Sequence, residues 1–247
     1  MSTQTEATRF SATQDAAYVA PERFSQLLLI WSGPVLVAMT MLGMIILAPY
    51  VPATDPTANA ETIQAFYLDN LWGIRFGMVL CLIAFSLLVP FGVGIALQTR
   101  RMETIPAMSW LQVAAIAVCA FEGIMAVLIW LAAAYRPGEV SAEITLTLHD
   151  LGWLTFLIDI PIFSIWLAAV GIAILRDRKS PPLLPRWLGY FTLWVAILLA
   201  PALGIEFFKT GPFAYNGLLA LYLPFVMIFL WMIVIVPPLL KAMDTPR

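Results

Sequence analysis

Charged side chains are scarce in this sequence: Asp, Glu, Lys and Arg together account for 11% of its 247 residues. A soluble domain of ordinary composition has about 25%. Hydrophobic residues make up 62%, and a chain of this composition is solvated mainly by lipid rather than by water. The sequence also has no basic patch with interleaved aromatic residues, which argues against nucleic acid as a partner.

Histidine and cysteine are nearly absent too. His149 is the only histidine, so one chain cannot supply a bis-histidine haem or a histidine-rich metal centre. Cys81 and Cys119 both fall in apolar runs, where cysteine acts as a small apolar helix residue rather than as a redox partner. A Walker A loop, a GxSxG nucleophile elbow, an HExxH zinc site and a paired Asp-rich diphosphate site are also missing. We therefore predict no metal site and no cofactor.

The sequence does contain a series of long apolar runs. Each reaches the ~20 residues that a helix needs to cross ~30 Å of hydrocarbon. We therefore predict an all-α integral membrane protein, a bundle of six transmembrane helices in the lipid bilayer. The predicted spans cover about 24–51, 76–97, 110–134, 152–175, 187–208 and 218–240, which form one domain at 24–241.

The segments outside these spans are polar. Residues 1–23 show no apolar periodicity, so we predict a disordered cytoplasmic tail there, and residues 242–247 form a second, short cytoplasmic tail. Between the first two spans, residues 52–74 combine loop signals with apolar residues spaced for a helix. This pattern predicts a short helix at the membrane interface.

Basic residues give the orientation of the bundle. Of the 13 Lys and Arg residues, ten fall on one side of the predicted spans, and only Arg75, Arg136 and Lys209 fall on the other. Because Lys and Arg are retained in cytoplasmic loops, we predict a multi-pass protein of the cell (inner) membrane with both termini in the cytoplasm. Trp72 and Trp153 are then predicted to belong to an aromatic belt at the outer interface.

A short pattern recurs along the chain. The segment VGIA occurs at 93–96 and again at 170–173, and Arg101 and Trp110 have counterparts at the same offset of 77. The spacing predicts that helices two and three are a parallel internal repeat of helices four and five, an arrangement found in transporters. The alternative is that an arginine, a polar loop and a tryptophan are simply common features of inner-membrane hairpins.

The stretch from His149 to Trp166 carries the strongest functional signal. Asp159 lies inside its apolar run, where a carboxylate costs several kcal/mol, and Pro161 weakens the helix beside the acid by removing a backbone donor. Glu122 is a second acid within the spans, roughly 18 Å along its helix from Trp110 and near the middle of the bilayer. Asp159 is expected in the outer half of the bilayer. These two acids are the candidate catalytic residues.

Three further residues are predicted near the outer ends of the spans. Arg75 has a side chain long enough to reach inward toward Asp159. Glu206 is three residues from Lys209, a spacing that predicts an ion pair. His149 is either a ligand contact or an ordinary residue at the start of a helix. The predicted substrate-binding set is Arg75, Glu122, His149, Asp159 and Glu206, placed around a cavity that helices two to five enclose and that opens toward the outer side.

Three classes of function remain open. We favour a carrier or binding protein for a small, largely apolar molecule, because proline interrupts five of the six spans, as in the broken helices of transporters. The first alternative is a membrane enzyme that uses its acids for isomerisation or cyclisation of a lipid-soluble substrate. The second is a non-catalytic subunit of a membrane complex, in which the acids join helices. Because six spans are few for a transporter, a homo-oligomer is also possible on the sequence alone.

Overall fold

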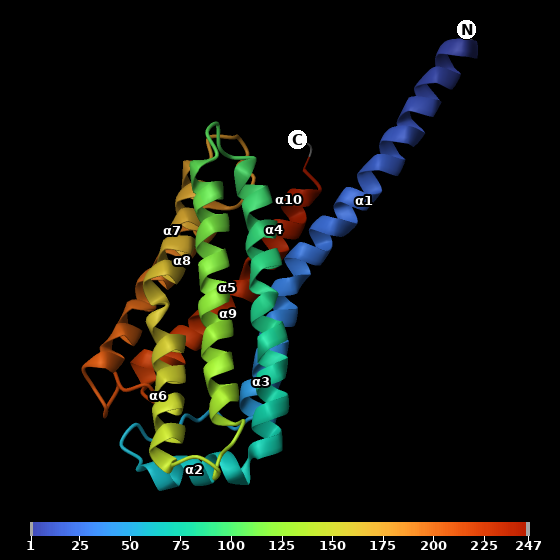
Figure 1. Cartoon of the computed structure of the whole chain (residues 1–247). Helices are drawn as coiled ribbons and strands as arrows, with labels where there is room; N and C mark the ends of the chain where they lie inside the picture. Colours follow the sequence, from blue (N-terminus) through green and yellow to red (C-terminus); the bar gives the residue numbers. More distant parts are fainter. Residues whose placement is uncertain (1, 246–247) are drawn as a thin grey trace.

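The computed structural model describes residues 2–245, with side chains from residue 22 onward. Its secondary structure is helical, and the described residues contain no β-strand (Figure 1). Six helical segments in this part are long and apolar enough to cross a membrane, and they confirm the predicted six-helix membrane bundle. They are Glu22–Leu47, Leu71–Arg100, Ala107–Ala133, Ala142–Arg176, Arg186–Glu206 and Leu218–Met243.

Most of these spans consist of more than one helix. Span one joins α1 (Ser2–Met41) to a π-helical turn, η1 (Leu42–Leu47), and span two joins α3 (Leu71–Ser86) to α4 (Leu88–Arg100). Span three is the single helix α5 (Ala107–Ala133), and span four is α6 (Ala142–Ile158) with α7 (Ile160–Arg176). Span five is α8 (Arg186–Leu198) with the 3-10 helix η2 (Ala200–Glu206). Span six contains η3 (Leu218–Tyr222), α9 (Leu223–Val234) and α10 (Val236–Met243).

The short helix predicted between spans one and two is present as α2 (Ala60–Asp69). The side chain of Asn59 caps it by accepting a hydrogen bond from the backbone N–H of Thr62, which satisfies one of the free donors at a helix start. α2 buries Ile63 and Tyr67 and packs against α6. It therefore closes one end of the bundle, here called the α2 end (Figure 1).

Several helix limits differ from the sequence-based prediction. Span one ends at Leu47 rather than near 51, because the next residue, Ala48, precedes Pro49 and a residue before proline avoids the helical conformation. Span four begins at Ala142, ten residues before its predicted start. At the N-terminus, the backbone is helical from Ser2 and α1 projects beyond the bundle (Figure 1), and the disorder of residues 1–23 stays a prediction.

The spans follow one another around a closed ring. α5 contacts α3 and α4 of span two and α6 and α7 of span four; α8 packs against α7 and α9; and α9 and α10 return to α1. The ring is tight where spans one and two cross, because a Cβ on Gly77 would clash with the backbone carbonyl of Gly43. Small residues at such crossings let helix backbones approach closely, so the six spans form one packed unit.

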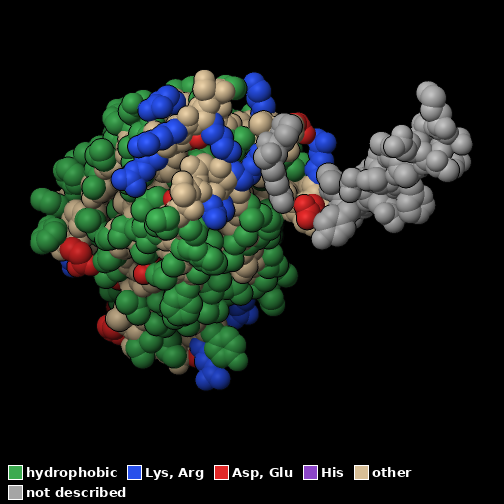
Figure 2. Space-filling model, turned by 90° about the horizontal axis from the view of Figure 1, so that it is seen from above, with side chains coloured by type: hydrophobic (Ala, Val, Ile, Leu, Met, Phe, Trp, Pro, Cys, Tyr) green, Lys and Arg blue, Asp and Glu red, His purple; other side chains and the backbone are tan. Residues whose placement is uncertain are grey.

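Basic residues separate to the two ends of this bundle. Figure 2 shows Lys and Arg side chains gathered over the end opposite α2, which is formed by the loops at 101–106 and 177–185 and is called the basic end below. The other ends of the spans carry Arg75, near the start of span two, and Arg136 and Lys209, just after spans three and five. The separation agrees with the predicted orientation, whereas the side that faces the cytoplasm stays a prediction.

The predicted internal repeat gains no support from the packing of its matched glycines. Gly94 lies against Leu29 and Ile30 of span one, whereas its counterpart Gly171 lies against Gly189 of span five. The two equivalent positions therefore face different neighbours in the ring.

Candidate functional site: a central cavity beside a helix break

Span four breaks at Asp159. α6 ends at Ile158 and α7 begins at Ile160, with Asp159 between them at φ −65° and ψ −4°. Pro161 follows in the first turn of α7 and has no N–H, so the carbonyl of Leu157 lacks the donor that an unbroken helix would supply. The break lies at the middle of a 35-residue span, with 17 helical residues on each side. Asp159 therefore lies at the midpoint of this span, and its place in the outer half of the bilayer stays a prediction.

Asp159 lines a cavity of about 70 Å³ inside the ring. It is the only polar residue of that lining, and the other described lining residues are apolar. They come from span one (Leu36), span two (Phe85, Leu88), span four (Phe156, Leu157, Ile160, Phe163), span five (Leu199) and span six (Pro224, Phe225, Ile228, Phe229, Met232). Helices two to five were predicted to enclose the cavity. Spans two, four and five do line it, but spans one and six line it as well, and span three contributes no lining residue.

The carboxyl group of Asp159 has no hydrogen-bond partner among the described residues. It lies at the N-terminal end of α7, where the helix dipole favours negative charge, and its side chain does not cap the helix. An intramembrane carboxyl without a partner is costly unless a ligand, water or a proton satisfies it. The site is thus an apolar cavity with one unsatisfied polar group.

Glu122 is beside this cavity but outside its lining. It is close enough to Asp159 for the two carboxyl groups to interact electrostatically. One of its oxygens, Oε2, is buried without a hydrogen-bond partner. The two acids are therefore neighbours, although Glu122 does not line the cavity.

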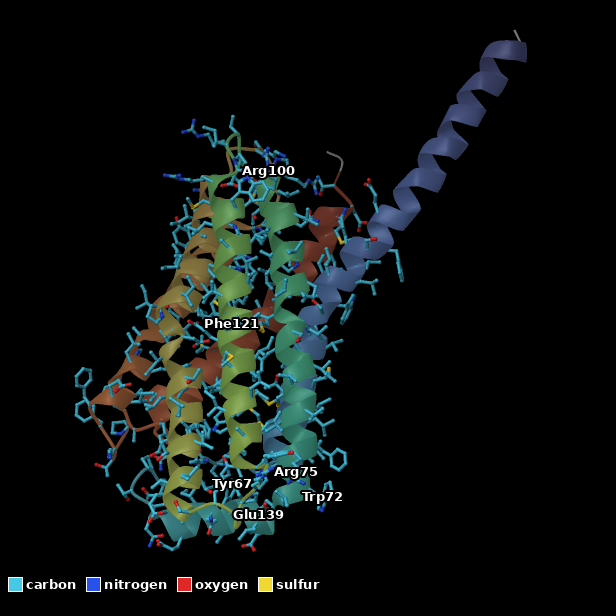
Figure 3. The ribbon with its side chains drawn as sticks, in the orientation of Figure 1. Tyr67, Trp72, Arg75, Arg100, Phe121 and Glu139 are labelled. Atoms are coloured by element: carbon cyan, nitrogen blue, oxygen red, sulfur yellow. The ribbon has the colours of Figure 1, made fainter. Side chains whose placement is uncertain are left out.

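Arg75 and Glu206 do not line the cavity around which they were predicted to lie. The guanidinium of Arg75 donates to the carbonyls of Ala134 (3.0 Å) and Tyr135 (2.9 Å) at the end of α5, and it lies over the ring of Trp72. Figure 3 shows Arg75 with Trp72 and Tyr67 at the α2 end. The C-terminal carbonyls of a helix attract cations. Arg75 therefore caps the C-terminal end of α5 and does not pair with Asp159.

Glu206 is exposed at the end of η2 and forms no ion pair with Lys209. The prediction of that pair relied on α-helical spacing, but the chain is 3-10 helical up to Glu206 and leaves the helix at Phe207. The charge of Lys209 acts instead on Asp150. Neither Glu206 nor Lys209 contributes to the lining of the central cavity.

His149 is fully buried within α6 at the α2 end, not at the start of a helix. Its Nε2 lies 2.7 Å from the Thr54 hydroxyl and 3.2 Å from the indole N–H of Trp153, and its Nδ1 lies 3.1 Å from the Tyr67 hydroxyl. Since an indole nitrogen only donates, Trp153 requires Nε2 to accept, and Nδ1 then carries the proton. These contacts fit a neutral imidazole that is held by the segment before α2, by α2 and by its own helix, α6.

Aromatic rings surround His149. Tyr50 donates a hydrogen bond to Tyr67 (2.7 Å), and Tyr215 stacks on Trp153 with ring centroids 5.3 Å apart. Burial raises the pKa of the Tyr50 and Tyr67 phenols and raises the pKa of Tyr215 to about 12, so these hydroxyls stay neutral near pH 7. Trp153 is thereby a buried core residue, and its predicted place in an aromatic belt is wrong.

This aromatic cluster (Tyr50, Phe66, Tyr67, Trp130, His149, Trp153 and Tyr215) is continuous with the central cavity. Phe156 touches the rings of Trp130 and Trp153 on one side and of Phe225 on the other, and both Phe156 and Phe225 line the cavity. The cluster therefore packs between the cavity and the α2 end. Its tyrosines escaped the sequence analysis because tyrosines near span ends are ordinary interfacial residues.

Comparison with protein-family models, with curated proteins and with solved structures finds no match to this chain. The class of protein therefore follows from the architecture itself, in which six apolar spans and a closed ring of helices define a polytopic α-helical membrane protein. Within the ring, the cavity beside Asp159 offers space for a ligand.

Proposed function

We propose that this protein is a membrane carrier or binding protein for a small, largely apolar molecule that has one hydrogen-bonding or cationic group. The observation that carries the proposal is the carboxyl of Asp159, which has no hydrogen-bond partner among the described residues and is the one polar group in the described lining of an otherwise apolar central cavity. Apolar walls take up the body of such a ligand, and a single polar group fixes its orientation. Asp159 accepts a hydrogen bond when ionised and donates one when protonated.

The size of the cavity limits the ligand. An engineered apolar cavity of about 150 Å³ in another protein binds benzene, so a cavity of about 70 Å³ admits a group of only a few atoms as it stands. A larger ligand requires the walls to move. The break at Asp159 and the proline at the start of α9, Pro224, which itself lines the cavity, supply the interrupted helices through which such movement occurs in transporters.

The residues that line the cavity with Asp159 favour a carrier over an enzyme. Acid–base isomerisation or cyclisation uses one group to donate a proton and another to accept one, and the described lining contains no second polar side chain. Glu122, the other candidate catalytic residue, is outside the lining. A purely structural subunit would use its acid to join helices, whereas Asp159 makes no interhelical hydrogen bond among the described residues.

The test uses three ligands of one shape, namely toluene, benzyl alcohol and benzylamine, with the purified protein in detergent. Thermal unfolding is followed by tryptophan fluorescence for the wild type, Asp159→Leu and the control Glu122→Gln. A bound ligand raises the melting temperature, and we expect the alcohol or the amine to raise it more than toluene does in the wild type and in Glu122→Gln. In Asp159→Leu this difference should vanish.

Two outcomes would contradict the proposal. One is an equal response of the wild type and Asp159→Leu to all three ligands, which would leave the carboxyl without a role. The other is the absence of any response together with stabilisation by Leu199→Phe, a substitution that fills the cavity. That result would indicate a packing void and favour the structural subunit. Flux of the active ligand into proteoliposomes then separates a carrier from a protein that only binds.

The same proposal includes the setting of the protein: the cell (inner) membrane, with the basic end and both termini in the cytoplasm. The separation of basic residues between the two ends of the spans supports this orientation. Assembly with a second copy or with another membrane protein is compatible with a bundle of this size.

A further inference from the structure

A groove opens at the basic end, away from the central cavity. It lies between the loop that precedes α5 and the loop that joins α7 to α8, and its volume is about 1070 Å³. Four cations line it: Arg176, Arg178, Lys179 and Arg186. Two acids, Glu103 and Asp177, line it as well.

The carboxylates of both acids accept hydrogen bonds from backbone N–H groups. The carboxylate of Asp177 is buried and accepts the backbone N–H groups of Lys179 (3.0 Å) and Leu183 (2.8 Å). The carboxylate of Glu103 accepts the N–H groups of Met108 (2.9 Å) and Ser109 (3.1 Å) at the start of α5 and the hydroxyl of Ser109. They fix the shape of the two loops, because carboxylates with several N–H donors bind them strongly.

The cations are consequently left without acidic partners. The side chains of Arg176, Arg178 and Lys179 make no hydrogen bond or ion pair with the described residues, and that of Arg186 donates only to the carbonyl of Leu175 (3.3 Å). All four are exposed. The groove thus combines a fixed backbone with four cations that are free to bind an anion from outside the chain.

The surroundings of the groove are those of a lipid surface. Ile105, in the loop that lines the groove, is 77% exposed, and Trp110 and Trp187, at the first turns of α5 and α8, are 69% and 53% exposed. Indole side chains prefer the level of the lipid headgroups. An anion in the groove would therefore lie at headgroup depth, with apolar surface directly below it for acyl chains.

We propose that this groove binds the phosphate of an anionic phospholipid at the membrane surface. Arginine binds phosphate oxygens through paired N–H donors, and basic pockets between transmembrane helices bind anionic headgroups. The apolar flank assigns the ligand to lipid rather than to a soluble phosphate compound.

The experiment measures binding of phosphatidylglycerol and phosphatidylcholine to the purified full chain in detergent by native mass spectrometry. The test variant is Arg178→Gln/Lys179→Gln, and the matched control is Arg23→Gln/Arg100→Gln, which removes the same charge from the basic end outside the groove. With each cation near an anionic surface worth about fivefold in affinity, we expect phosphatidylglycerol to bind roughly 30-fold more weakly to the test variant. The control should change by less than threefold, and phosphatidylcholine binding should not change.

Each other outcome overturns the assignment. An equal loss in both double variants would show attraction to net charge without a site. Binding of inorganic phosphate or glycerol 3-phosphate to the wild type as tightly as phosphatidylglycerol would assign the groove to a soluble anion. Unchanged phosphatidylglycerol binding in Arg178→Gln/Lys179→Gln would leave the groove without a ligand. All the substituted residues are exposed, and the contacts of the control residues, Arg23 with Asp244 and Arg100 with the carbonyl of Glu103, are exposed as well. Folding of the variants should therefore not limit the comparison.

Discussion

Two residues of span four, the half-buried Asp159 and the buried Gly152, show how much depends on a single side chain in this membrane bundle. Asp159 keeps a carboxyl beside an apolar cavity without a partner among the described residues, at a cost that hydrophobic packing elsewhere must offset. Gly152, two turns earlier, matters because it has no side chain. It leaves space for the indole of Trp130, whose N–H donates to the carbonyl of His149 (3.3 Å).

Replacing Asp159 by leucine should keep the protein folded and inserted. Removal of an unpaired buried polar group should raise the free energy of unfolding by about 1–3 kcal/mol, and leucine fits the apolar lining. The level of protein in the membrane and its melting temperature in detergent check this. Failure of Asp159→Leu to accumulate would instead show that the carboxyl supports the fold.

Replacing Gly152 by alanine should destabilise the protein. A Cβ at this position clashes with the indole of Trp130, and overpacking of this kind costs about 1–3 kcal/mol. The matched control is Leu151→Ala on the neighbouring outward face, where the side chain is 45% exposed. A melting temperature for Gly152→Ala equal to that of Leu151→Ala would mean that Trp130 can move aside.

At the scale of elements, the segment before α2 is held by side chains rather than by a ladder of backbone bonds. Thr54 bonds to His149 of α6 and lies 3.4 Å from the hydroxyl of Tyr215. Tyr50 bonds to Tyr67 of α2. The segment, α2, α6 and the loop before span six are therefore joined through one cluster of neutral hydroxyls and rings, which tightens the α2 end of the bundle.

Stability should fall in alkali because of this cluster. Burial raises the pKa of Tyr215 to about 12, above the ~10 of a phenol in the unfolded chain. Below pH 10 both states keep the proton, so the contribution of Tyr215 is constant. Between pH 10 and 12 the unfolded chain loses the proton first, which favours unfolding. Chemical unfolding at pH 8–12 should show a steeper loss for the wild type than for Tyr215→Phe, and parallel curves would contradict the shift.

For the whole molecule, the ring order of the spans and the separation of basic residues define how the bundle lies in the membrane. The central cavity and the basic groove are distinct, since they share no lining residue. One lies at the middle of the bundle and the other at its basic end. A ligand in the cavity and a lipid in the groove could thus be bound at once, on walls that both include span four.

Reporter fusions should test the orientation. Fusions after Leu97 and Leu175 should give a cytoplasmic signal, and fusions at Thr57 and Glu143 an external one, because basic loops stay in the cytoplasm. An external signal from the loop between α7 and α8 would reverse the orientation. Leu97 and Leu175 lie near the basic end of spans two and four, whereas Thr57, just before α2, and Glu143, at the start of span four, lie at the opposite end. Each pair therefore controls for the other.

The sequence by itself determined the six spans, the short helix before span two and the uneven distribution of basic residues. These features depend on the transfer of consecutive residues from water to lipid, and that free energy is set by local composition. Proline also acts locally: Pro161 indicated the weak point in span four, and Pro49, which was overlooked, ends span one. Asp159 was identified for the same reason, since a carboxyl in an apolar run is visible without any knowledge of its neighbours.

Only the tertiary structure decided which residues and cavities the polar side chains contact. The cavity draws its lining from five spans, Arg75 turns to the end of α5, and His149 meets residues 95 and 82 positions away in the chain, Thr54 and Tyr67. Such contacts depend on which helices become neighbours in the ring and on how far each helix extends. The apolar helix surfaces that pack the ring are chemically alike, so a residue pattern predicts that a helix crosses the membrane but not which face turns inward.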